Sequence, residues 1–139
     1  MEEYLGKSYV MVSEENFEAY LELREISLWK RKIASKVRPT QTLTRNASGT
    51  YTFSVKAPLF NWEVEFTPGQ EYEATSPDGD SKITGVITFE GNVMTHKQTE
   101  KEKGRVTIHK LEFSPEETIV TTTIEGSDLV VKRVYKLVK

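Results

Sequence analysis

The stretch Leu129-Val-Val-Lys-Arg133-Val-Tyr135-Lys-Leu137 alternates between two kinds of side chain. Side chains alternate across a β-strand, so Arg133 and Tyr135 share the face that carries the aliphatic residues, and Lys132 and Lys136 occupy the other. The aliphatic face should point inward. An inward arginine is costly unless an anion or several acceptors meet it, and a tyrosine hydroxyl two residues along donates to the same acceptor. The stretch therefore predicts a strand with an interior anion site, and two alternatives stay open: an ion pair between Arg133 and an interior glutamate, or a register in which Arg133 faces solvent.

Most of the chain after Pro39 consists of similar short segments separated by turn residues. Examples are Tyr51–Val55, Trp62–Phe66 and Ile119–Ile124, which alternate or are rich in β-branched residues. Glycine, proline, asparagine and aspartate cluster in the breaks between them. Short strands in succession with tight turns favour an antiparallel meander, and closing a meander into a barrel removes its edges. We therefore predict a mainly all-β fold, an antiparallel up-and-down β-barrel.

A different pattern lies between Ser13 and Pro39, where the apolar residues from Phe17 onward follow helical spacing. Ser13 is a candidate N-cap for a first helix, and Ser27 is a candidate N-cap for a second. Pro39 should end the helical segment. The sequence thus predicts two short helices after the first strand, placed as a lid over one mouth of the barrel.

The predicted interior differs from an ordinary core because polar residues share the inward positions. The inward candidates are Phe53, Val55, Ala57, Ile87, Phe89, Thr122, Arg133 and Tyr135. A register shifted by one residue adds three further polar residues, His96, Gln98 and His109. A mixed lining suits a hydrated cavity that holds an amphipathic ligand better than a dry core.

Composition excludes several classes of protein. The 139 residues suffice for one domain with a sizeable core or internal cavity, and we expect residues 1–139 to form a single domain. A net charge of -2 provides no broad basic surface, so nucleic acid is not an expected partner. The absence of cysteine excludes a disulfide framework and a thiol nucleophile. The acidic N-terminus lacks a secretory signal and no apolar stretch is long enough to span a membrane, which predicts a soluble, cytoplasmic protein.

No pattern in the sequence indicates catalysis or metal binding. His96 and His109 are the only histidines, and no HxH, HExxH or cysteine ligand accompanies them. Nucleophile-elbow, phosphate-binding and paired-carboxylate arrangements do not stand out. We therefore expect no catalytic residue, no metal site and no cofactor, and we interpret the histidines as residues that line the cavity.

Several motifs resemble one family over nearly the whole chain. Lys7-x-Tyr9-x-Met11 is followed, after four residues, by Asn16-Phe17-Glu18-x-Tyr20-Leu21-x-x-Arg24. Gly69-Gln70-Glu71-Tyr72-Glu73 lies further along, and Arg133-Val134-Tyr135 ends the series. These motifs resemble the intracellular lipid-binding proteins, the cytosolic fatty-acid-binding family. The resemblance implies a ten-stranded, calycin-like barrel, a helix-turn-helix lid after the first strand, and a monomeric, non-enzymatic carrier of one long-chain fatty acid.

The resemblance also implies a set of site residues. Arg133 and Tyr135 correspond to the family's carboxylate-binding pair. Many members place a second arginine where this chain has Leu111, or Lys110 if a loop differs by one residue, so His109 or Thr122 is expected to assist the pair. The residues expected to contact ligand are Arg133, Tyr135, Thr122, His109, Leu111, Phe17, Tyr20, Val55, Leu59 and Gln98.

The mouth departs from the family pattern. The link between the lid helices usually contains glycine, whereas here it reads Arg24-Glu25-Ile26-Ser27, which should stiffen it. The position of a portal aromatic is taken by Leu59, after Pro58. We expect ligand choice or release to differ accordingly.

The lid is also basic, through Lys30, Arg31, Lys32 and Lys36. These residues are the solvated face of an amphipathic helix, a surface that transiently touches anionic membranes, or both.

Three functions remain open on the sequence. The first is a carrier of a fatty acid, or of a retinoid or other acidic lipid, since the Arg-Tyr pair requires only a carboxylate. The second is an enzyme that uses the cavity for hydrolysis or isomerisation, and the third is a barrel that serves as a protein-interaction module. Fold alone does not separate them.

Overall fold

The computed structural model describes residues 1–58, 60–77 and 79–138. Two helices follow the first strand: α1 (Phe17–Leu23) and α2 (Leu28–Lys36). A short 3-10 helix, Glu2–Tyr4, precedes that strand. The strands are β1 (Ser8–Glu15), β2 (Thr40–Arg45), β3 (Tyr51–Ala57), β4 (Phe60–Phe66), β5 (Tyr72–Thr75), β6 (Lys82–Glu90), β7 (Val93–Glu100), β8 (Val106–Phe113), β9 (Glu117–Ile124) and β10 (Val130–Leu137).

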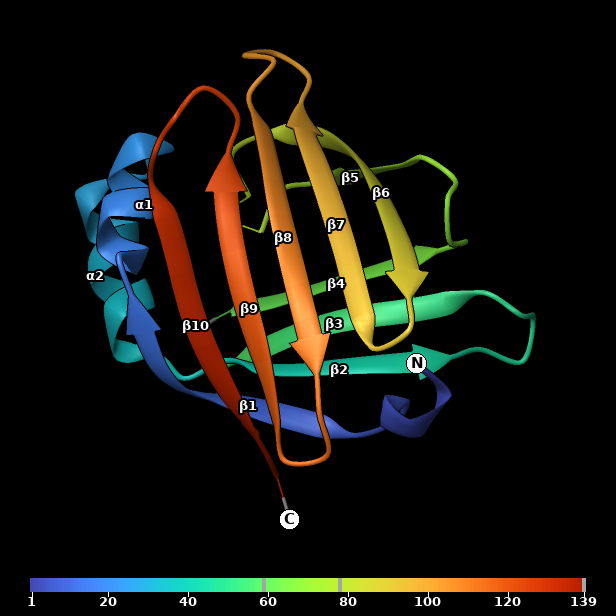
Figure 1. Cartoon of the computed structure of the whole chain (residues 1–139). Coiled ribbons are helices and arrows are strands. Elements are labelled where there is room, and N and C mark those ends of the chain that lie inside the picture. The colour runs from blue at the N-terminus through green and yellow to red at the C-terminus, as the bar shows by residue number, and fades with distance from the viewer. Residues whose placement is uncertain (59, 78, 139) are drawn as a thin grey trace.

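The ten strands form one antiparallel sheet that curls into a nearly closed barrel, which confirms the predicted fold class (Figure 1). The order is β4-β3-β2-β1-β10-β9-β8-β7-β6-β5, so chain neighbours pair and β1 joins β10. β4 and β5 stand at the two ends of this order. β1 has a register irregularity between Met11 and Ser13, which lets it pair with β2 on one side and follow β10 on the other.

The strand faces follow the alternation expected from the sequence. In β10, Val131 and Tyr135 are buried and Lys132 and Lys136 are exposed, so Arg133 lies on the inward face as predicted. The buried apolar residues form two clusters. One lies inside the barrel and includes Tyr9, Phe53 and Tyr135, and the other packs the lid helices against β9 and β10.

The lid begins later than predicted. Ser13 is not an N-cap, because β1 continues to Glu15 and its last residues pair with β10. Long-range strand pairing therefore prevails over the local capping signal. The N-cap of α1 is Asn16, and the Glu14 carboxylate accepts a hydrogen bond from the Phe17 backbone N–H at 3.0 Å. The prediction for Ser27 is confirmed, since its side chain accepts from the Lys30 backbone N–H at 3.4 Å.

The link between the helices is held by charge. Glu25 adopts a left-handed backbone conformation with φ of 60°, which is unfavourable for a residue other than glycine. Its carboxylate accepts hydrogen bonds from the Lys103 ammonium and, at 2.8 Å, from the Arg105 guanidinium. These partners, Lys103 first, lower the pKa of Glu25. The glycine-free link is thus pinned to the connection between β7 and β8.

One glycine shapes the barrel wall. Gly85 of β6 faces Tyr72 of β5 in the sheet register, and the tyrosine ring lies over it. A Cβ atom at Gly85 would overlap the Tyr72 ring. The absent side chain therefore allows the ring to cross β6 toward β7, where its hydroxyl bonds His96.

We expect Gly85→Ala to lower the free energy of unfolding by about 1–3 kcal/mol, the usual cost of overpacking. Urea denaturation measures the loss. In a Tyr72→Ala background the same change should be neutral or stabilise by about 0.5–1 kcal/mol, because alanine suits a strand better than glycine. An equal loss in both backgrounds would show that the Tyr72 ring is not the cause.

Candidate functional site

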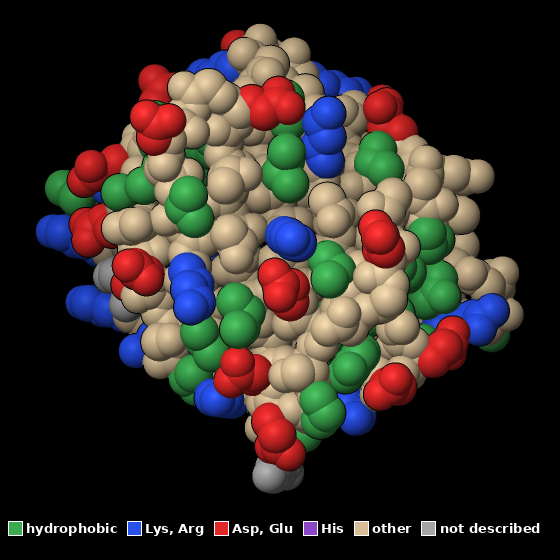
Figure 2. Space-filling view, viewed as in Figure 1, with side chains coloured by type: hydrophobic (Ala, Val, Ile, Leu, Met, Phe, Trp, Pro, Cys, Tyr) green, Lys and Arg blue, Asp and Glu red, His purple; other side chains and the backbone are tan. Residues whose placement is uncertain are grey.

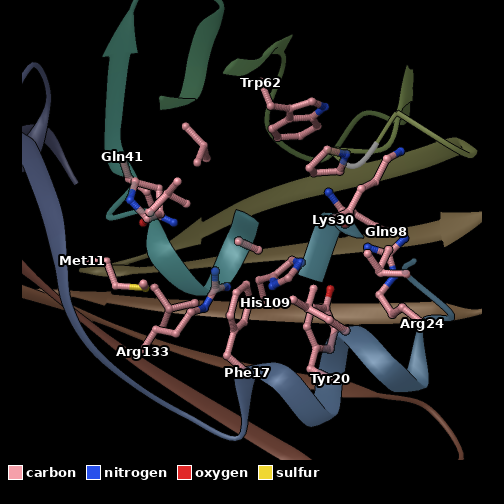
Figure 3. A pocket seen from close by; sticks show the side chains of 18 of the residues that line it. Met11, Phe17, Tyr20, Arg24, Lys30, Gln41, Trp62, Gln98, His109 and Arg133 are labelled. Carbon is pink, nitrogen blue, oxygen red and sulfur yellow. The ribbon is translucent and has the colours of Figure 1, made fainter. Parts of the chain in front are cut away.

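A cavity of about 360 Å³ lies between the lid helices and the inner faces of the strands (Figure 3). Its lining is mostly aromatic and aliphatic, from Met11 and Phe17 at one side to Trp62 at the other. The polar residues that border it are Arg24, Lys30, Gln41, His96, Gln98, His109 and Arg133. An apolar container with few polar groups is the usual form of a small-molecule site.

Arg133 supplies a positive charge inside this container. Its guanidinium donates to the Tyr135 hydroxyl through Nη1 and to Thr122 Oγ1 through Nη2, both at 3.3 Å, and lies 5.2 Å from the centre of the Phe17 ring. Nε is buried and has no hydrogen-bond partner. Within residues 1–58, 60–77 and 79–138, no carboxylate forms an ion pair with Arg133. The structure therefore contradicts both alternatives for Arg133. No glutamate among the described residues pairs with it, and its side chain lies on the inward face of β10 at the cavity.

Tyr135 and Thr122 lie behind the guanidinium rather than in the cavity wall. Both side chains are fully buried, and neither borders the cavity. Burial raises the pKa of Tyr135, although the Arg133 charge opposes the rise, so the phenol stays protonated at neutral pH. Their contacts with Arg133 orient the charge, and the expectation that they contact the ligand themselves stays a prediction.

His109 extends the polar group from β10 to β8. Its Nδ1 lies 2.8 Å from Thr122 Oγ1, and its ring borders the cavity next to Phe17 and Tyr20 (Figure 3). Burial, followed by the Arg133 charge, holds the pKa of His109 well below its usual value, so the ring is neutral at pH 7. Arginine only donates hydrogen bonds, so the Thr122 oxygen accepts from Arg133.

A second polar group lies next to His109. The rings of His96 and His109 are 5.8 Å apart, and His96 Nε2 meets the Tyr72 hydroxyl and, at 3.4 Å, the Gln98 amide. Trp62 stacks on His96 at 6.0 Å. Burial lowers the pKa of His96 to about 3, so this ring is also neutral. Burial also raises the pKa of the Tyr72 hydroxyl to about 12.

Most other predicted site residues border the cavity. Phe17, Tyr20, Val55, Gln98 and Leu111 all line it, and His96 joins them. Lys110, the alternative to Leu111, is exposed on the outer face, because Leu111 occupies the inward position of β8. Leu59 lies outside the described residues.

Several cavity residues, among them Arg24 and Trp62, were not assigned to the site from the sequence, and neither was Tyr72, which contacts the cavity residue His96. Arg24 was part of the N-terminal motif and Trp62 part of an alternating strand, but neither was assigned to the site. Tyr72 reaches His96 only because Gly85 stands opposite it. The pairing of Tyr72 with Gly85 depends on the register of β5 against β6, which cannot be predicted before the sheet is known. Alternation in β4 was the one available signal for Trp62.

The basic residues of the lid divide into two groups. Lys30 borders the cavity and binds Asp80 at 2.7 Å, and Arg31 donates to the Ile26 carbonyl at 3.0 Å. Lys32 and Lys36 are exposed. Figure 2 shows Lys and Arg side chains protruding at the edge formed by the helices, whereas charges of both signs are interspersed over the outer face of the strands.

The described residues hold no group of three or more histidine, aspartate or glutamate side chains placed to bind a metal. None of the helices in that part of the chain has the length and hydrophobicity of a membrane-spanning segment.

The buried histidines generate a pH dependence of stability. Their pKa values in the folded protein lie below about 6.5, the value in an unfolded chain. As the pH falls below 6.5 the unfolded state binds protons that the folded state excludes, so the free energy of unfolding decreases. We expect a loss of about 1 kcal/mol for each histidine between about pH 7 and 5.5, measured by urea denaturation.

His96→Phe provides the control, because it removes one of the two titrating rings. About half of the pH-dependent loss should disappear, whatever the variant's stability at pH 7. An unchanged slope would mean that His96 is already accessible to protons in the folded protein.

Comparison with known proteins places this barrel among its relatives. No protein-family model matches the chain. Fatty acid-binding protein 2 of Manduca sexta is 31% identical over 135 residues, which cover 96% of this chain and 98% of the relative. The crystal structure of Echinococcus granulosus fatty-acid-binding protein 1 has a TM-score of 0.88 at 25% identity, with both chains fully covered.

A Schistosoma mansoni fatty acid binding protein in complex with arachidonic acid has a TM-score of 0.89 at 23% identity, covering 100% of this chain and 98% of that one. This likeness concerns the fold. The identity to the Manduca sexta protein over nearly the full length of both chains establishes the relationship. The chain belongs to the fatty-acid-binding protein family, a family of non-enzymatic lipid carriers with an intracellular lipid-binding fold.

Proposed function

We propose that this protein carries one long-chain fatty acid in its cavity, with the carboxylate held by Arg133. Tyr135 and Thr122 orient the guanidinium, and His109 completes the polar end of the site. Residues 1–139 act as one domain, as a monomer in the cytoplasm. The single observation that carries the proposal is the Arg133 guanidinium, which borders an apolar cavity and lacks a carboxylate partner among the described residues.

The energetics favour an anionic ligand. A charge removed from water is costly unless an opposite charge or several acceptors compensate it. Arg133 has two neutral acceptors, Thr122 and Tyr135, and a buried Nε without a partner. A carboxylate can accept two parallel hydrogen bonds from a guanidinium, which supplies the missing charge. The cavity volume of about 360 Å³ falls in the roughly 300–1,000 Å³ range of small-molecule sites.

The Manduca sexta relative is named a fatty acid-binding protein, and the Schistosoma mansoni structure holds arachidonic acid. Both names agree with the proposed ligand class. A retinoid or another acidic lipid would satisfy Arg133 equally well, because the guanidinium requires only a carboxylate. Competition between oleate and retinoic acid for a bound fluorescent fatty acid distinguishes these ligands.

An empty barrel that serves as a protein-interaction module is the second function to exclude. Native mass spectrometry of the purified protein, followed by lipid extraction, should detect one fatty acid per chain. Absence of any bound lipid, together with no saturable uptake of oleate, would refute the carrier.

The role of Arg133 is tested by comparing charged and uncharged ligands. Arg133→Gln should weaken oleate binding by about 1.5–3 kcal/mol, the value of a hydrogen bond to a charged group. Methyl oleate should bind both proteins almost equally, because the ester carries no charge. Isothermal titration measures both ligands. Equal losses for acid and ester would show that Arg133 acts on the fold and not on the head group.

Tyr135→Phe is the matched control for that experiment. The tyrosine contacts Arg133 and does not border the cavity. Loss of its hydroxyl should therefore weaken oleate binding by about 1 kcal/mol, the contribution of a hydrogen bond between neutral groups. A loss as large as that of Arg133→Gln would indicate direct contact with the carboxylate.

We also propose that the lid touches anionic membranes during transfer. Trp29, Lys32 and Lys36 lie on one face of α2, at i, i+3 and i+7. Trp29 is 71% exposed and Leu28 is 55% exposed, an unusual degree for large apolar side chains. Exposed aromatic and aliphatic residues beside lysines are typical of a helix that rests at a bilayer surface.

Lys32→Glu combined with Lys36→Glu should slow transfer of a fluorescent fatty acid to vesicles that contain acidic lipid. Each lysine near such a surface contributes about 1 kcal/mol, and salt screens the attraction. Stopped-flow fluorescence against vesicles of increasing acidic fraction measures the rate. Equilibrium affinity should remain nearly unchanged, because neither lysine borders the cavity.

Lys97→Glu with Lys110→Glu is the matched control, since it changes net charge equally through exposed lysines on the outer face of β7 and β8. This variant should transfer lipid like the wild type. Equal slowing by both pairs would assign the effect to overall charge, and a wild-type rate independent of vesicle concentration would exclude membrane contact.

A further inference from the structure

A row of polar side chains begins at Arg133 and runs from strand to strand along the inner face of the barrel. His109 of β8 stands opposite Thr122 of β9 in one direction and opposite His96 of β7 in the other. A contact joins each step: Arg133 lies 3.3 Å from Thr122, Thr122 lies 2.8 Å from His109, and the centres of the two imidazole rings are 5.8 Å apart. The row therefore extends over four neighbouring strands.

Gly85 allows one further polar residue, Tyr72, to join the row. Tyr72, Gly85 and Gln98 face one another across β5, β6 and β7. Because Gly85 has no side chain, the Tyr72 ring crosses β6 and its hydroxyl reaches His96. His96, Gln98 and Tyr72 thus form a compact polar cluster, in which His96 and Gln98 lie on β7, three strands away from Arg133 in the sheet order.

The two histidines and Gln98 bring polar atoms to the cavity wall. Tyr72 and Gln98 both approach His96 Nε2, so this nitrogen accepts and the imidazole proton resides on Nδ1. On His109, Thr122 contacts Nδ1, so the other ring nitrogen, Nε2, is not engaged by Thr122. His96, Gln98 and His109 all border the cavity, and Trp62 and Phe53 enclose His96 on its other sides.

A carboxylate at Arg133 leaves this second cluster unused. An unsubstituted hydrocarbon chain that fills the cavity displaces water from the cluster and supplies no acceptor. Leaving a buried donor unpaired is more costly than an ordinary hydrogen bond is favourable. An oxygen atom along the chain would accept from these donors and remove that cost.

We propose that His96, His109 and Gln98 form a second subsite, which binds the oxygen of a fatty acid that carries a hydroxyl, keto or epoxide group along its chain. The inference rests on the proposed function, because Arg133 must hold the carboxylate for the chain oxygen to reach the cluster. It narrows the ligand from fatty acids in general to oxygenated fatty acids.

Isothermal titration with stearate and a series of hydroxystearate positional isomers tests the subsite. One contiguous range of hydroxyl positions should bind roughly three- to tenfold more tightly than stearate, the effect of about one hydrogen bond. Positions outside that range should bind no better than stearate, because the carboxylate sets the distance to the cluster.

Gln98→Met removes a polar partner while keeping side-chain length, and it should abolish the preference, measured within this variant as the ratio of hydroxystearate to stearate affinity. A thermal melt confirms that the variant folds. The wild type offers an independent readout through the nitrogen-15 resonances of its two histidine rings. The preferred hydroxystearate should shift ring nitrogen signals of His96 or His109 more than stearate does.

The outcomes separate this inference from the proposed function. If neither stearate nor any isomer binds, the carrier itself is refuted and the subsite with it. If stearate binds and no isomer is preferred, the carrier stands and the subsite is overturned. A preference that persists in Gln98→Met without a difference in the histidine signals also overturns it, because the oxygen is then recognised elsewhere.

Discussion

The guanidinium of Arg133 is a permanent charge inside the barrel, and the order of the polar interior depends on how it is accommodated. Tyr135 and Thr122 accept its hydrogen bonds, and Phe17 covers one face. Because arginine only donates, both hydroxyl oxygens act as acceptors toward it, and Thr122 links the guanidinium to His109. The same charge helps keep that histidine neutral. The cavity therefore combines the Arg133 charge, which has no carboxylate partner among the described residues, with the uncharged polar side chains of His96, Gln98 and His109.

The lid is held over this interior by charge as well as by apolar packing. Arg24 and Arg105 approach the buried Glu100 carboxylate at 3.9 and 3.4 Å, and Arg105 also binds Glu25. Lys30 adds a bond to Asp80. Buried ion pairs contribute little net stability but strongly penalise arrangements that separate them. The ion pairs thus specify one position of the lid, while Tyr20, Leu21 and Ile26 supply the apolar contact.

Much of the fold was predictable because its signals are local. Alternation in 129–137 assigned Arg133 to the inward face, and Ser27 capped the second helix as expected. Where local and distant interactions competed, the distant ones prevailed. Ser13 has the chemistry of an N-cap, yet its backbone is held by β10. Lys30 lies in a basic helix segment, yet Asp80 binds it at the mouth.

The sequence by itself determined the alternation within the strands, the two lid helices and Arg133 as the candidate interior cation, since these depend on periodicity and on residues close in the chain. Only the tertiary structure decided which polar residues meet. Thr122, His109, His96 and Tyr72 come from four strands, and a shift of one residue in any pairing would turn a side chain to the outer face. Register depends on the turns and on the packing of the whole barrel. For that reason the Arg133 site was visible in one strand, whereas the cluster around His96 became visible only when the sheet was closed.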